Sequence, residues 1–352
     1  MIKTLNFFNN LINNKLTTKN ENFKHLKIGL IGAGTQGTIL SSLIEESGAK
    51  LVAVHDTNLV RARKLKLLHK ADLATDKLEE FFNINMDGVL ICTMPKVRIE
   101  PIKLACKNKI HLLIEKPAAY NLKEGQECYS LIKNSNIISS VGFQLRYEPR
   151  YERLKEIIKN QEIHLVRTVC TVDYFLNYKM PDWYLKNELS GGPVAEQAIH
   201  LLDIVRFILG NPKATNVSSF GVRNMEVDKQ EYDSLNAVQL MYELDNKAIG
   251  VHTNHSGHEN TYFDLELIGP HTRLYANASE KNIHGIINGK KINEITPEKT
   301  NLGLNKVTAW LKAIKTGDRK YIKSDFLEAL NTQSLVDAAI KSNNTKNVVS
   351  II

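Results

Sequence analysis

The sequence predicts a two-domain α/β protein, with a parallel, doubly wound sheet first and an antiparallel or mixed sheet after it. The chain has 352 residues, which suits two domains better than one. Residues 26 to about 145 alternate apolar strand candidates with helical stretches, as in a parallel sheet that is covered by helices. Beyond residue 147, longer strands follow one another with short links, which favours antiparallel pairing.

Short apolar runs with β-branched residues mark the strands of the first half, as is typical of buried parallel strands. These strands are expected at about 27–31, 51–55, 88–92, 111–114 and 138–142. Helices are expected between them, at about 36–46, 58–70, 76–83, 97–108 and 122–134.

The second half opens with a helix at about 150–159 and a long strand in EIHLVRTVCTVDYF. GGPVAEQAIHLLDIVRFILG then predicts a strong helix, with Pro193 near its first turn and Gly210 at its end. Further strands are expected at about 214–222, 234–244, 247–255, 261–268 and 272–276. Helices return at about 304–316 and 325–342.

The composition is that of an ordinary soluble globular protein, with 43% hydrophobic and 24% charged residues. Four cysteines form no C-x-x-C pair and no metal-ligand spacing, so we expect a reducing compartment and no disulfide framework. No segment approaches the ~20 apolar residues of a membrane span. The net charge of +8 comes without a zinc, helix-turn-helix or RNA-binding signature, so we expect a lysine-rich surface and no nucleic-acid partner.

Residues 1–24 are rich in asparagine and precede the first strand, so we expect a flexible N-terminal extension with a short helix around FFNNLINNKL. The first twenty residues contain no acid, as in a mitochondrial presequence, but they lack arginine and the compact apolar core of a secretory signal. We expect a cytoplasmic protein, with mitochondrial targeting as the minor alternative.

The stretch LIGAGTQGTIL carries three glycines, Gly32, Gly34 and Gly37, between a strand and a helix. In a dinucleotide site the first glycine makes a tight turn, the second lets the backbone approach the pyrophosphate, and the third lets helix and strand pack closely. The pyrophosphate then meets the free N–H groups at the helix N-terminus. Glycine-rich turns are common, so the strand–turn–helix context is what favours a dinucleotide site here.

Asp56 ends the next strand, LVAVHD, near the spacing of about 20 residues at which a carboxylate holds the adenosine ribose. The alternative is a loop aspartate that caps the next helix. With the glycines in place we favour the ribose role, which predicts NAD as the cofactor. NADP stays possible because Arg61, Arg63 and Lys64 follow on the next helix, although a solvated helix face explains them more simply.

Two further stretches carry candidate proton chemistry. IEKPAA follows the strand at 111–114, at the sheet edge where open α/β sheets bind ligands; its Lys116 belongs either to a solvated turn or to a reactive pocket. Glu196 and His200 stand at i and i+4 of the long helix, where a carboxylate can support a histidine acid–base group. Taken alone, such a pair is more often a surface pair than a catalytic one.

HTNHSGH places His252, His255 and His258 three residues apart. Alternation along a strand separates them and no acid–cysteine set accompanies them, which disfavours metal ligation. A substrate contact by His255 is the better prediction, and we expect no metal site.

Four motifs in order connect this chain to one family: GAGTQG after the first strand, EKP after a later one, GFQLRY at the domain junction, and a GG…EQAIHLLD helix. With them the chain resembles the glucose–fructose oxidoreductase / inositol dehydrogenase (Gfo/Idh/MocA) family, over about residues 26 to 350. The glycine motif is unspecific, whereas the four motifs in this order are quite specific.

The resemblance implies an NAD(P)-binding Rossmann domain at 25–147 and a substrate-binding and oligomerisation α/β domain at 148–352 with an open, mainly antiparallel sheet. It implies that the last helix, about 325–342, packs back toward the first domain. It also implies a homodimer or homotetramer that acts on a small-molecule sugar, polyol or nucleotide sugar.

The resemblance also assigns roles to residues. Lys116 touches the cofactor and the reacting hydroxyl, His200 is the acid–base group, and Glu196 is a further catalytic candidate where the family usually has aspartate. Cofactor contacts are carried over to Gly32, Ala33, Gly34, Thr35, Gln36, Gly37, Asp56, Thr93, Pro95, Glu115, Lys116 and Gln144. Substrate contacts are expected from Arg146, Trp183, Tyr184 and His255. Met94 and Arg98 depart from the family pattern, which more often has proline and histidine there.

We therefore expect an NAD(P)-dependent dehydrogenase or reductase that moves a hydride between nicotinamide and a secondary alcohol or ketone. The alternative is a non-catalytic sensor or scaffold that binds the dinucleotide with the same fold. Intact Lys116 and His200 favour the enzyme, since a pure binder has no need of a proton relay. The identity of the substrate is not predicted by these motifs.

Overall fold

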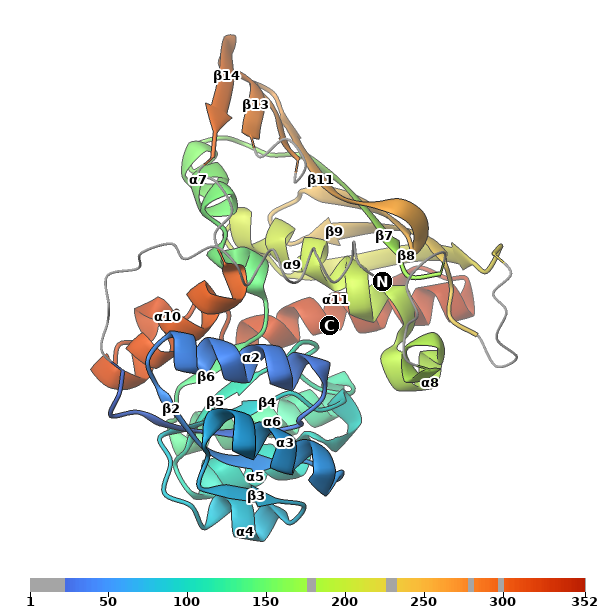
Figure 1. Cartoon of the computed structure of the whole chain (residues 1–352). Helices are drawn as coiled ribbons and strands as arrows, with labels where there is room; N and C mark the ends of the chain where they lie inside the picture. The colour runs from blue at the N-terminus through green and yellow to red at the C-terminus, as the bar shows by residue number, and fades with distance from the viewer. Residues whose placement is uncertain (1–22, 176–181, 226–232, 278–281, 297–300, 352) are drawn as a thin grey trace. The chain divides into compact units, whose positions relative to one another are not determined.

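The computed structural model describes residues 23–351 except 176–181, 226–232, 278–281 and 297–300 (Figure 1). The extension expected at 1–24, with its short helix, lies outside the described residues up to 22. The chain forms two compact units, which are described separately. The N-terminal unit runs to Tyr147 and includes Thr300–Leu330, and the C-terminal unit comprises Glu148–Lys299 and Asn331–Ile352.

The N-terminal unit contains a six-stranded parallel sheet with the order β3-β2-β1-β4-β5-β6. Its strands are β1 (Lys27–Ile31), β2 (Lys50–His55), β3 (Leu73–Thr75), β4 (Gly88–Ile91), β5 (His111–Ile114) and β6 (Ser139–Val141). The chain starts in the middle and winds outward in both directions, so the predicted doubly wound sheet is confirmed. The three-residue β3 was missed because its run is too short to show a strand pattern.

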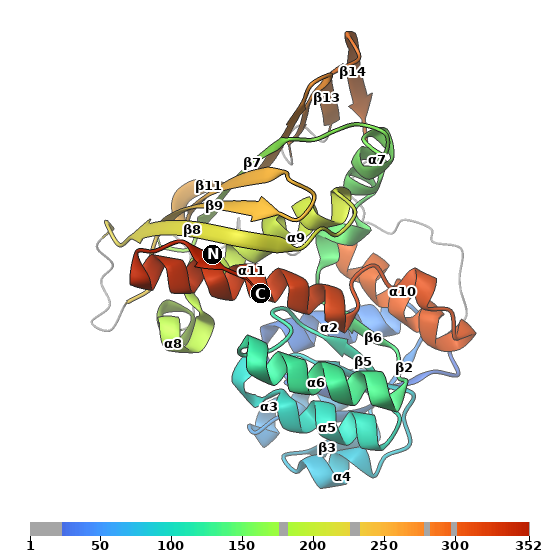
Figure 2. The ribbon, with the colours of Figure 1, turned by 180° about the vertical axis from the view of Figure 1, so that it is seen from behind.

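Helices cover this sheet on both faces. They are α2 (Thr35–Glu46), α3 (Leu59–His69), α4 (Leu78–Phe82), α5 (Ile99–Lys107), α6 (Leu122–Ser135) and α10 (Leu302–Thr316), with the short helices η1 (Pro95–Val97), η2 (Gln144–Tyr147) and η5 (Arg319–Tyr321). Helix α2 packs on α3 and α10, whereas α5 packs on α4 and α6. The two sets lie on opposite faces, since α2 and α3 stand before the sheet in Figure 1 and α5 and α6 in Figure 2.

Helix α10 belongs to the N-terminal unit, although the sequence analysis placed all of 148–352 in the second domain. Val307, Trp310 and Leu311 of α10 are fully buried in one apolar cluster with β1, β2 and α2. The indole packs on Gly88, where an added Cβ would lie 2.7 Å from the ring. Phe23, which the sequence analysis assigned to the extension, is 1% exposed in the same cluster. Phe23 is therefore part of this core.

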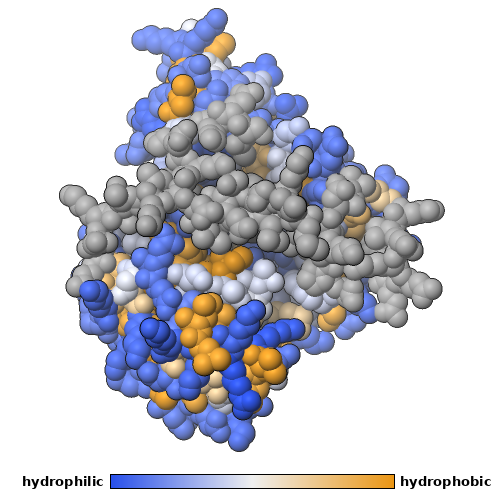
Figure 3. Space-filling view, viewed as in Figure 1, coloured by the Kyte–Doolittle hydropathy of each residue, from blue (hydrophilic) through white to orange (hydrophobic). Residues whose placement is uncertain are grey.

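The surface around this core is mostly hydrophilic on the side seen in Figure 3, with apolar residues between. Arg61, Arg63 and Lys64 of α3 are exposed. Val60 and Leu67 of the same helix are also exposed, at 74% and 79%. The basic residues after Asp56 therefore lie on a solvated helix face.

The C-terminal unit contains a nine-stranded sheet with the order β14-β13-β12-β11-β7-β10-β9-β8-β15. Its strands are β7 (Leu165–Asp173), β8 (Ala214–Val222), β9 (Ala237–Leu244), β10 (Ile249–His255), β11 (Gly257–Gly269), β12 (Thr272–Asn277), β13 (Asn282–Ile287), β14 (Lys290–Ile295) and β15 (Val349–Ser350). Among the strands that the structure describes in this sheet, only the β7–β10 pair is parallel. The mainly antiparallel sheet is confirmed, and the two-residue β15 was not predicted.

One face of this sheet carries helices. The helical segments of the unit are α7 (Pro149–Ile157), η3 (Asp182–Leu185), α8 (Asn187–Ser190), η4 (Val194–Ala198), α9 (Ile199–Ile208) and most of α11 (Phe326–Thr345). Ser342 and Asn343 of α11 accept hydrogen bonds from the backbone of β8. Leu165, Met241 and Ile249 point to the other face and are 47%, 53% and 38% exposed. The sheet is therefore open on that side.

Candidate active site

The three glycines of the first turn have three different environments. Gly32 has φ of +96°, and a Cβ there would lie 2.8 Å from the Cys92 carbonyl carbon. A Cβ on Gly37 would lie 1.9 Å from the Gly32 carbonyl oxygen, whereas a Cβ on Gly34 would meet nothing within 4 Å. A dinucleotide-binding loop needs a tight turn at its first glycine, open space at its second and close helix–strand packing at its third, and the three glycines meet these conditions in this order.

Helix α2 begins at Thr35, directly after this loop. Its N-cap is Gly34, which has no side chain to occupy the first N–H groups, and its first turn carries no acid. The positive end of the dipole of this 12-residue helix therefore lies at the glycine loop, where no side chain of the cap or the first turn neutralises it. Ala33, Thr35 and Gln36 of the prediction lie on this same stretch of backbone.

Asp56 follows β2 and contacts the glycine loop. Its Oδ2 accepts a hydrogen bond from Ala33 N at 2.7 Å, and its Oδ1 accepts one from Asn58 N at 2.8 Å. The cap of α3 is Asn58, whose side chain accepts from Val60 N and Arg61 N. The helix-capping alternative for Asp56 is therefore wrong, and the carboxylate instead stabilises the loop that begins at Gly32.

The end of β4 lies beside the loop. A Cβ on Gly32 would be 3.1 Å from Thr93 N. Thr93 Oγ1 is buried and, within the described part of the chain, has no hydrogen-bond partner. Pro95 is buried and begins η1. Buried hydroxyls are normally paired, so an unpaired one beside an open glycine loop fits a polar ligand.

Glu115 and Lys116 follow β5 at the same carboxyl edge of the sheet. Glu115 Oε1 lies 2.6 Å from Lys306 Nζ of α10, whose side chain is 1% exposed. Burial alone would raise the pKa of Glu115, but the Lys306 charge and hydrogen bond, with Lys116 and Arg98, outweigh it and hold that pKa below its ordinary value. Glu115 is thus an ionised carboxylate surrounded by cations, and Lys116 is half-buried next to it.

Arg98 is 3% exposed and binds backbone carbonyls around this turn. Its Nε donates to the Thr93 carbonyl at 3.0 Å, and its Nη1 donates to the carbonyls of Glu115 and Pro117. One guanidinium therefore joins the ends of β4 and β5, on both sides of Lys116.

Gln144 and Arg146 lie on η2. Gln144 is half-buried, and its backbone N–H donates to the Gly142 carbonyl at 2.9 Å. Arg146 is fully buried; its Nη1 donates to the Lys323 carbonyl at 2.7 Å and its Nη2 lies 4.0 Å from Glu328. These contacts favour a structural role for Arg146 over the expected substrate contact.

In the C-terminal unit, the predicted Glu196 and His200 lie where a π-helical turn meets an α-helix. The sequence predicted one continuous helix, but Val194–Ala198 is π-helical and α9 begins at Ile199. Gly191 and Gly192 before it have φ of +75° and +68°. Apolar spacing over one turn does not distinguish the two helix types, and single π turns are frequent at functional sites. Glu196 is buried and His200 is half-buried.

Two tyrosines and a glutamine form a network beside Glu196. Gln197 Nε2 donates to the hydroxyls of Tyr184, at 3.0 Å, and of Tyr174. The two tyrosine rings meet edge to face at 5.0 Å, and Trp183 packs on Tyr184 at 5.7 Å. Burial, with the nearby Glu196 charge, raises the pKa of Tyr174, so its hydroxyl keeps its proton. Trp183 and Tyr184 were predicted, whereas Gln197 and Tyr174 were not.

The three histidines of HTNHSGH do not act together. His252 is fully buried, hydrogen-bonds Thr168 Oγ1 at 2.8 Å, and has its pKa lowered by burial to about 3. His255 is half-buried at the end of β10, and burial and His258 lower its pKa. Among the described residues, no three histidine, cysteine, aspartate or glutamate side chains are grouped to hold a metal ion.

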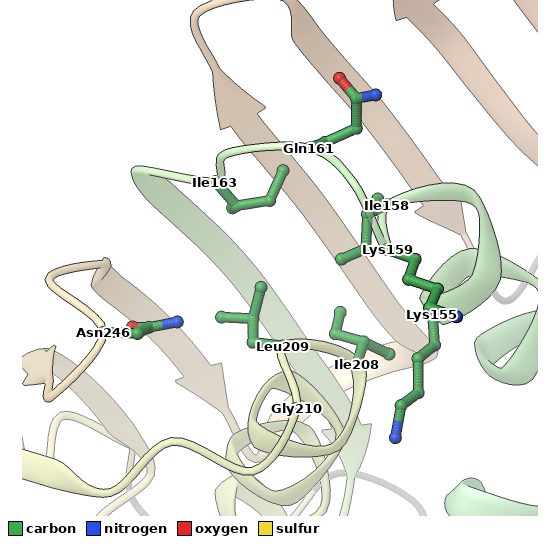
Figure 4. A pocket seen from close by; sticks show the side chains of 9 residues that line it. All are labelled: Lys155, Ile158, Lys159, Gln161, Ile163, Ile208, Leu209, Gly210 and Asn246. Carbon is green, nitrogen blue, oxygen red and sulfur yellow. The ribbon is translucent and has the colours of Figure 1, made fainter.

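A separate hollow of about 220 Å³ lies at the ends of α7 and α9 (Figure 4). Ile158, Ile163 and Leu209 are among its apolar lining, and Lys155 and Lys159 among its polar lining. None of the residues predicted for the active site lines it.

Three contacts with predicted residues or their neighbours were not expected from the sequence: those of Lys306 and Arg98 in the N-terminal unit and that of Gln197 in the C-terminal unit. Gln197 adjoins Glu196 in the helix motif, so its position was a usable signal. Lys306 stands 191 residues from Glu115 along the chain, and no local pattern connects them.

Comparison with known proteins matches two family models to the chain. The first, GFO_IDH_MocA, an oxidoreductase family with an NAD-binding Rossmann fold, matches residues 26–143, and its C-terminal α/β domain matches residues 155–351. An uncharacterized oxidoreductase of Bacillus subtilis, YrbE, is 24% identical over 242 residues, covering 66% of this chain and 67% of that protein. The myo-inositol 2-dehydrogenase of Thermotoga maritima is 28% identical over 196 residues, 53% of this chain and 55% of that protein.

A solved structure of levoglucosan dehydrogenase, in complex with NADH and levoglucosan, has the same fold, with a TM-score of 0.81 at 18% identity over 93% of this chain and 99% of that one. The match to the Thermotoga enzyme spans little more than half of its length. Within the part of the chain that the structure describes, no helix is both long and apolar enough to span a bilayer.

Proposed function

We propose that this chain, which belongs to the Gfo/Idh/MocA family of oxidoreductases, is an NAD-dependent dehydrogenase that acts on a secondary alcohol of a sugar or polyol. The observation that carries the proposal is the pairing of an open glycine loop with Lys116 at one edge of a parallel sheet. Ligands of open α/β sheets bind at this edge. The inositol substrate in the name of the Thermotoga relative supports a polyol.

The residues present fit the dinucleotide. Gly34 leaves space for a ligand beside the loop, and the N-terminus of α2 attracts the negative charge of a pyrophosphate. The buried Thr93 hydroxyl can form a hydrogen bond with the same ligand. Asp56 holds the loop and presents a carboxylate to the ribose hydroxyls. A nicotinamide ring held by these residues would supply the hydride acceptor for the alcohol carbon.

The chain's own residues handle the proton. We assign Lys116 to the substrate oxygen, where its ammonium stabilises the negative charge that grows as the O–H bond breaks. His200 takes the hydroxyl proton, and Glu196 orients the imidazole and stabilises its charged form. The C–H electron pair leaves as hydride and the O–H proton goes to His200, so the alcohol becomes a ketone. Lys116 and His200 belong to different units of the fold, and the proposal requires both to reach one hydroxyl.

A substrate screen tests this function. Inositols, free sugars, glycosides and nucleotide sugars are each incubated with the protein and NAD, and NADH absorbance is followed. Substrate-dependent NADH formation is expected with at least one compound of the polyol or sugar classes. Tight NADH binding without turnover on any of them would instead identify a non-catalytic dinucleotide-binding protein.

Cofactor preference is a second readout of the same site. We predict that NAD is preferred over NADP, because the Asp56 carboxylate accepts from a ribose 2′-hydroxyl and repels a 2′-phosphate. Asp56→Ser should lower kcat/KM with NAD by about 10- to 100-fold, which corresponds to the loss of a hydrogen bond to a charged group. The ratio of kcat/KM with NAD to kcat/KM with NADP should therefore decrease. If the wild-type protein favours NADP severalfold, the prediction is wrong, and residues Arg61–Arg63 are the ones expected to bind the 2′-phosphate.

A further inference from the structure

We propose that Lys306 of α10 is a positioning residue for Lys116 and that it acts through its ion pair with Glu115. The inference rests on the proposed function for its kinetic consequence. It rests on the structure alone for the contact chain, which runs from α10 to the turn after β5.

The contact chain has two steps. Lys306 Nζ lies 2.6 Å from Glu115 Oε1. The other carboxylate oxygen, Oε2, accepts the backbone N–H of Lys116 at 3.3 Å. A charge on α10 is therefore connected to the backbone of Lys116 through one carboxylate.

The carboxylate has little room to move. It lies against the backbone at the end of β6, where a Cβ on Gly142 would be 2.7 Å from Glu115 Oε2. The other carboxylate oxygen, Glu115 Oε1, contacts Lys306, whose side chain is 1% exposed. The pair is thus enclosed between a helix and a strand end, so that removing Lys306 alone would leave an uncompensated buried charge on Glu115.

Arg98 holds the same turn by different atoms. Its guanidinium donates to the carbonyls of Glu115 and Pro117, the residues on either side of Lys116. The backbone of the turn is therefore fixed by Arg98 and the Glu115 side chain by Lys306.

Charge explains why Lys306 matters for Lys116. An ionised carboxylate that is enclosed and has lost its partner attracts the nearest cation. Lys116 is among the cations that act on Glu115. Without Lys306, the Lys116 ammonium would be drawn onto Glu115 and away from a substrate oxygen. A displacement of about 1 Å at a reacting group can cost about 100-fold in rate.

The competing explanation is that the pair only attaches α10 to the sheet. Both explanations predict a less stable Lys306→Met protein, so stability does not separate them. They differ in whether the kinetic loss depends on Lys116. Damage to the fold lowers kcat by the same factor whatever residue stands at 116, whereas loss of positioning has no further effect once Lys116 is gone.

The experiment measures kcat, KM and the NADH Kd for Lys306→Met, for Lys306→Arg and for Lys306→Met in a Lys116→Met background. Lys315→Met, which removes an exposed lysine from the same helix, is the control. Lys306→Met should lower kcat about 10- to 100-fold with KM and Kd within about threefold. Lys306→Arg should have a kcat close to that of wild type. In the Lys116→Met background, adding Lys306→Met should lower kcat by less than about twofold. Equal factors in both backgrounds, or an unchanged kcat, overturn the proposal.

A second variant covers the case in which Lys306→Met does not fold. Lys306→Met combined with Glu115→Gln buries no unpaired charge and still removes the ion pair. Its kcat should lie between those of wild type and Lys306→Met, and it too should have no further effect without Lys116. If the Lys306→Met/Glu115→Gln change lowers kcat by the same factor in the Lys116→Met background as in wild type, the proposal is wrong.

A readout without turnover separates this proposal from the proposed function. Surface lysines are reductively methylated with ¹³C, and the Lys116 signal is identified by its loss in Lys116→Met. The signal should shift in Lys306→Met, where the Glu115 charge remains without its partner, and stay in place in Lys315→Met. An unshifted signal overturns the positioning role even if the enzyme is active, and a shifted one supports it even if the substrate screen finds no turnover.

Discussion

Gly34 is the N-cap of α2 and Gly37 lies three residues later in its first turn, yet alanine at the two positions should have different consequences. A methyl group on Gly34 meets nothing within 4 Å, and in the proposed function it would obstruct the approach of the backbone to the pyrophosphate. A methyl group on Gly37 lies 1.9 Å from a backbone oxygen of Gly32. One change therefore affects the ligand and the other affects the fold.

For Gly34→Ala we predict an NADH Kd raised at least about tenfold with an unchanged urea midpoint, because only the approach of the backbone to the ligand is blocked. Gly37→Ala should lose about 1–3 kcal/mol of the free energy of unfolding, the usual cost of overpacking. Fluorescence titration and urea unfolding measure the two effects. An unfolded Gly34→Ala protein, or one that binds NADH like wild type, would contradict the assignment of the loop.

Residues that act through local spacing could be predicted from the sequence, and those that act through distant partners could not. The glycines, Asp56 and Lys116 stand next to strand ends, where position alone indicates a site. Lys306 contacts Glu115 from 191 residues away along the chain, and Arg98 contacts the carbonyls of Glu115 and Pro117 from 17 and 19 residues away. Their sequence surroundings are those of ordinary helix cations, so only the structure assigns them.

At the scale of elements, α10 connects most directly to the proposed chemistry. Its periodicity predicted a helix at about 304–316, and the structure has one at Leu302–Thr316. Periodicity does not tell which sheet a helix packs against, and the helix follows the strands of the other unit along the chain. Its assignment to the N-terminal unit therefore required the structure.

Trp310 provides the test of this packing. The indole is fully buried and fills the space over Gly88 on β4. Trp310→Ala should cost about 3–5 kcal/mol of the free energy of unfolding, as for other large aromatic residues that leave a cavity. Lys312→Ala, on a less buried side of the same helix, is the matched control. A Trp310→Ala loss below about 1 kcal/mol in urea unfolding would show that α10 is not part of this core.

At the scale of the whole molecule, the open face of the C-terminal sheet predicts self-association. Leu165 pairs with Ile249 across β7 and β10, and Met241 pairs with Val251 across β9 and β10. Leu165, Ile249 and Met241 are exposed on one face, which they share with Arg167 and Glu243. Exposed apolar surface of this kind is typical of interaction sites. We predict a homodimer or homotetramer in which this face is covered.

Met241→Glu should shift the mass measured by light scattering to a smaller species at equal protein concentration, because a charge in a covered apolar interface is costly. Lys159→Glu, outside this face, should not. A wild-type protein that is monomeric at all concentrations, or a Met241→Glu protein with unchanged mass, would place the contact elsewhere.

In the proposed mechanism, Lys116 of one unit and His200 of the other serve the same hydroxyl. The kcat values of Lys116→Met, His200→Ala and the double variant, on a substrate found by the screen, test it most directly. Each single change should lower kcat by about 10²–10⁴, the usual value of acid–base catalysis. The double variant should be about as slow as the slower single one, because either loss breaks the same proton transfer. Multiplying losses, or a His200→Ala protein with near wild-type kcat, would contradict the account.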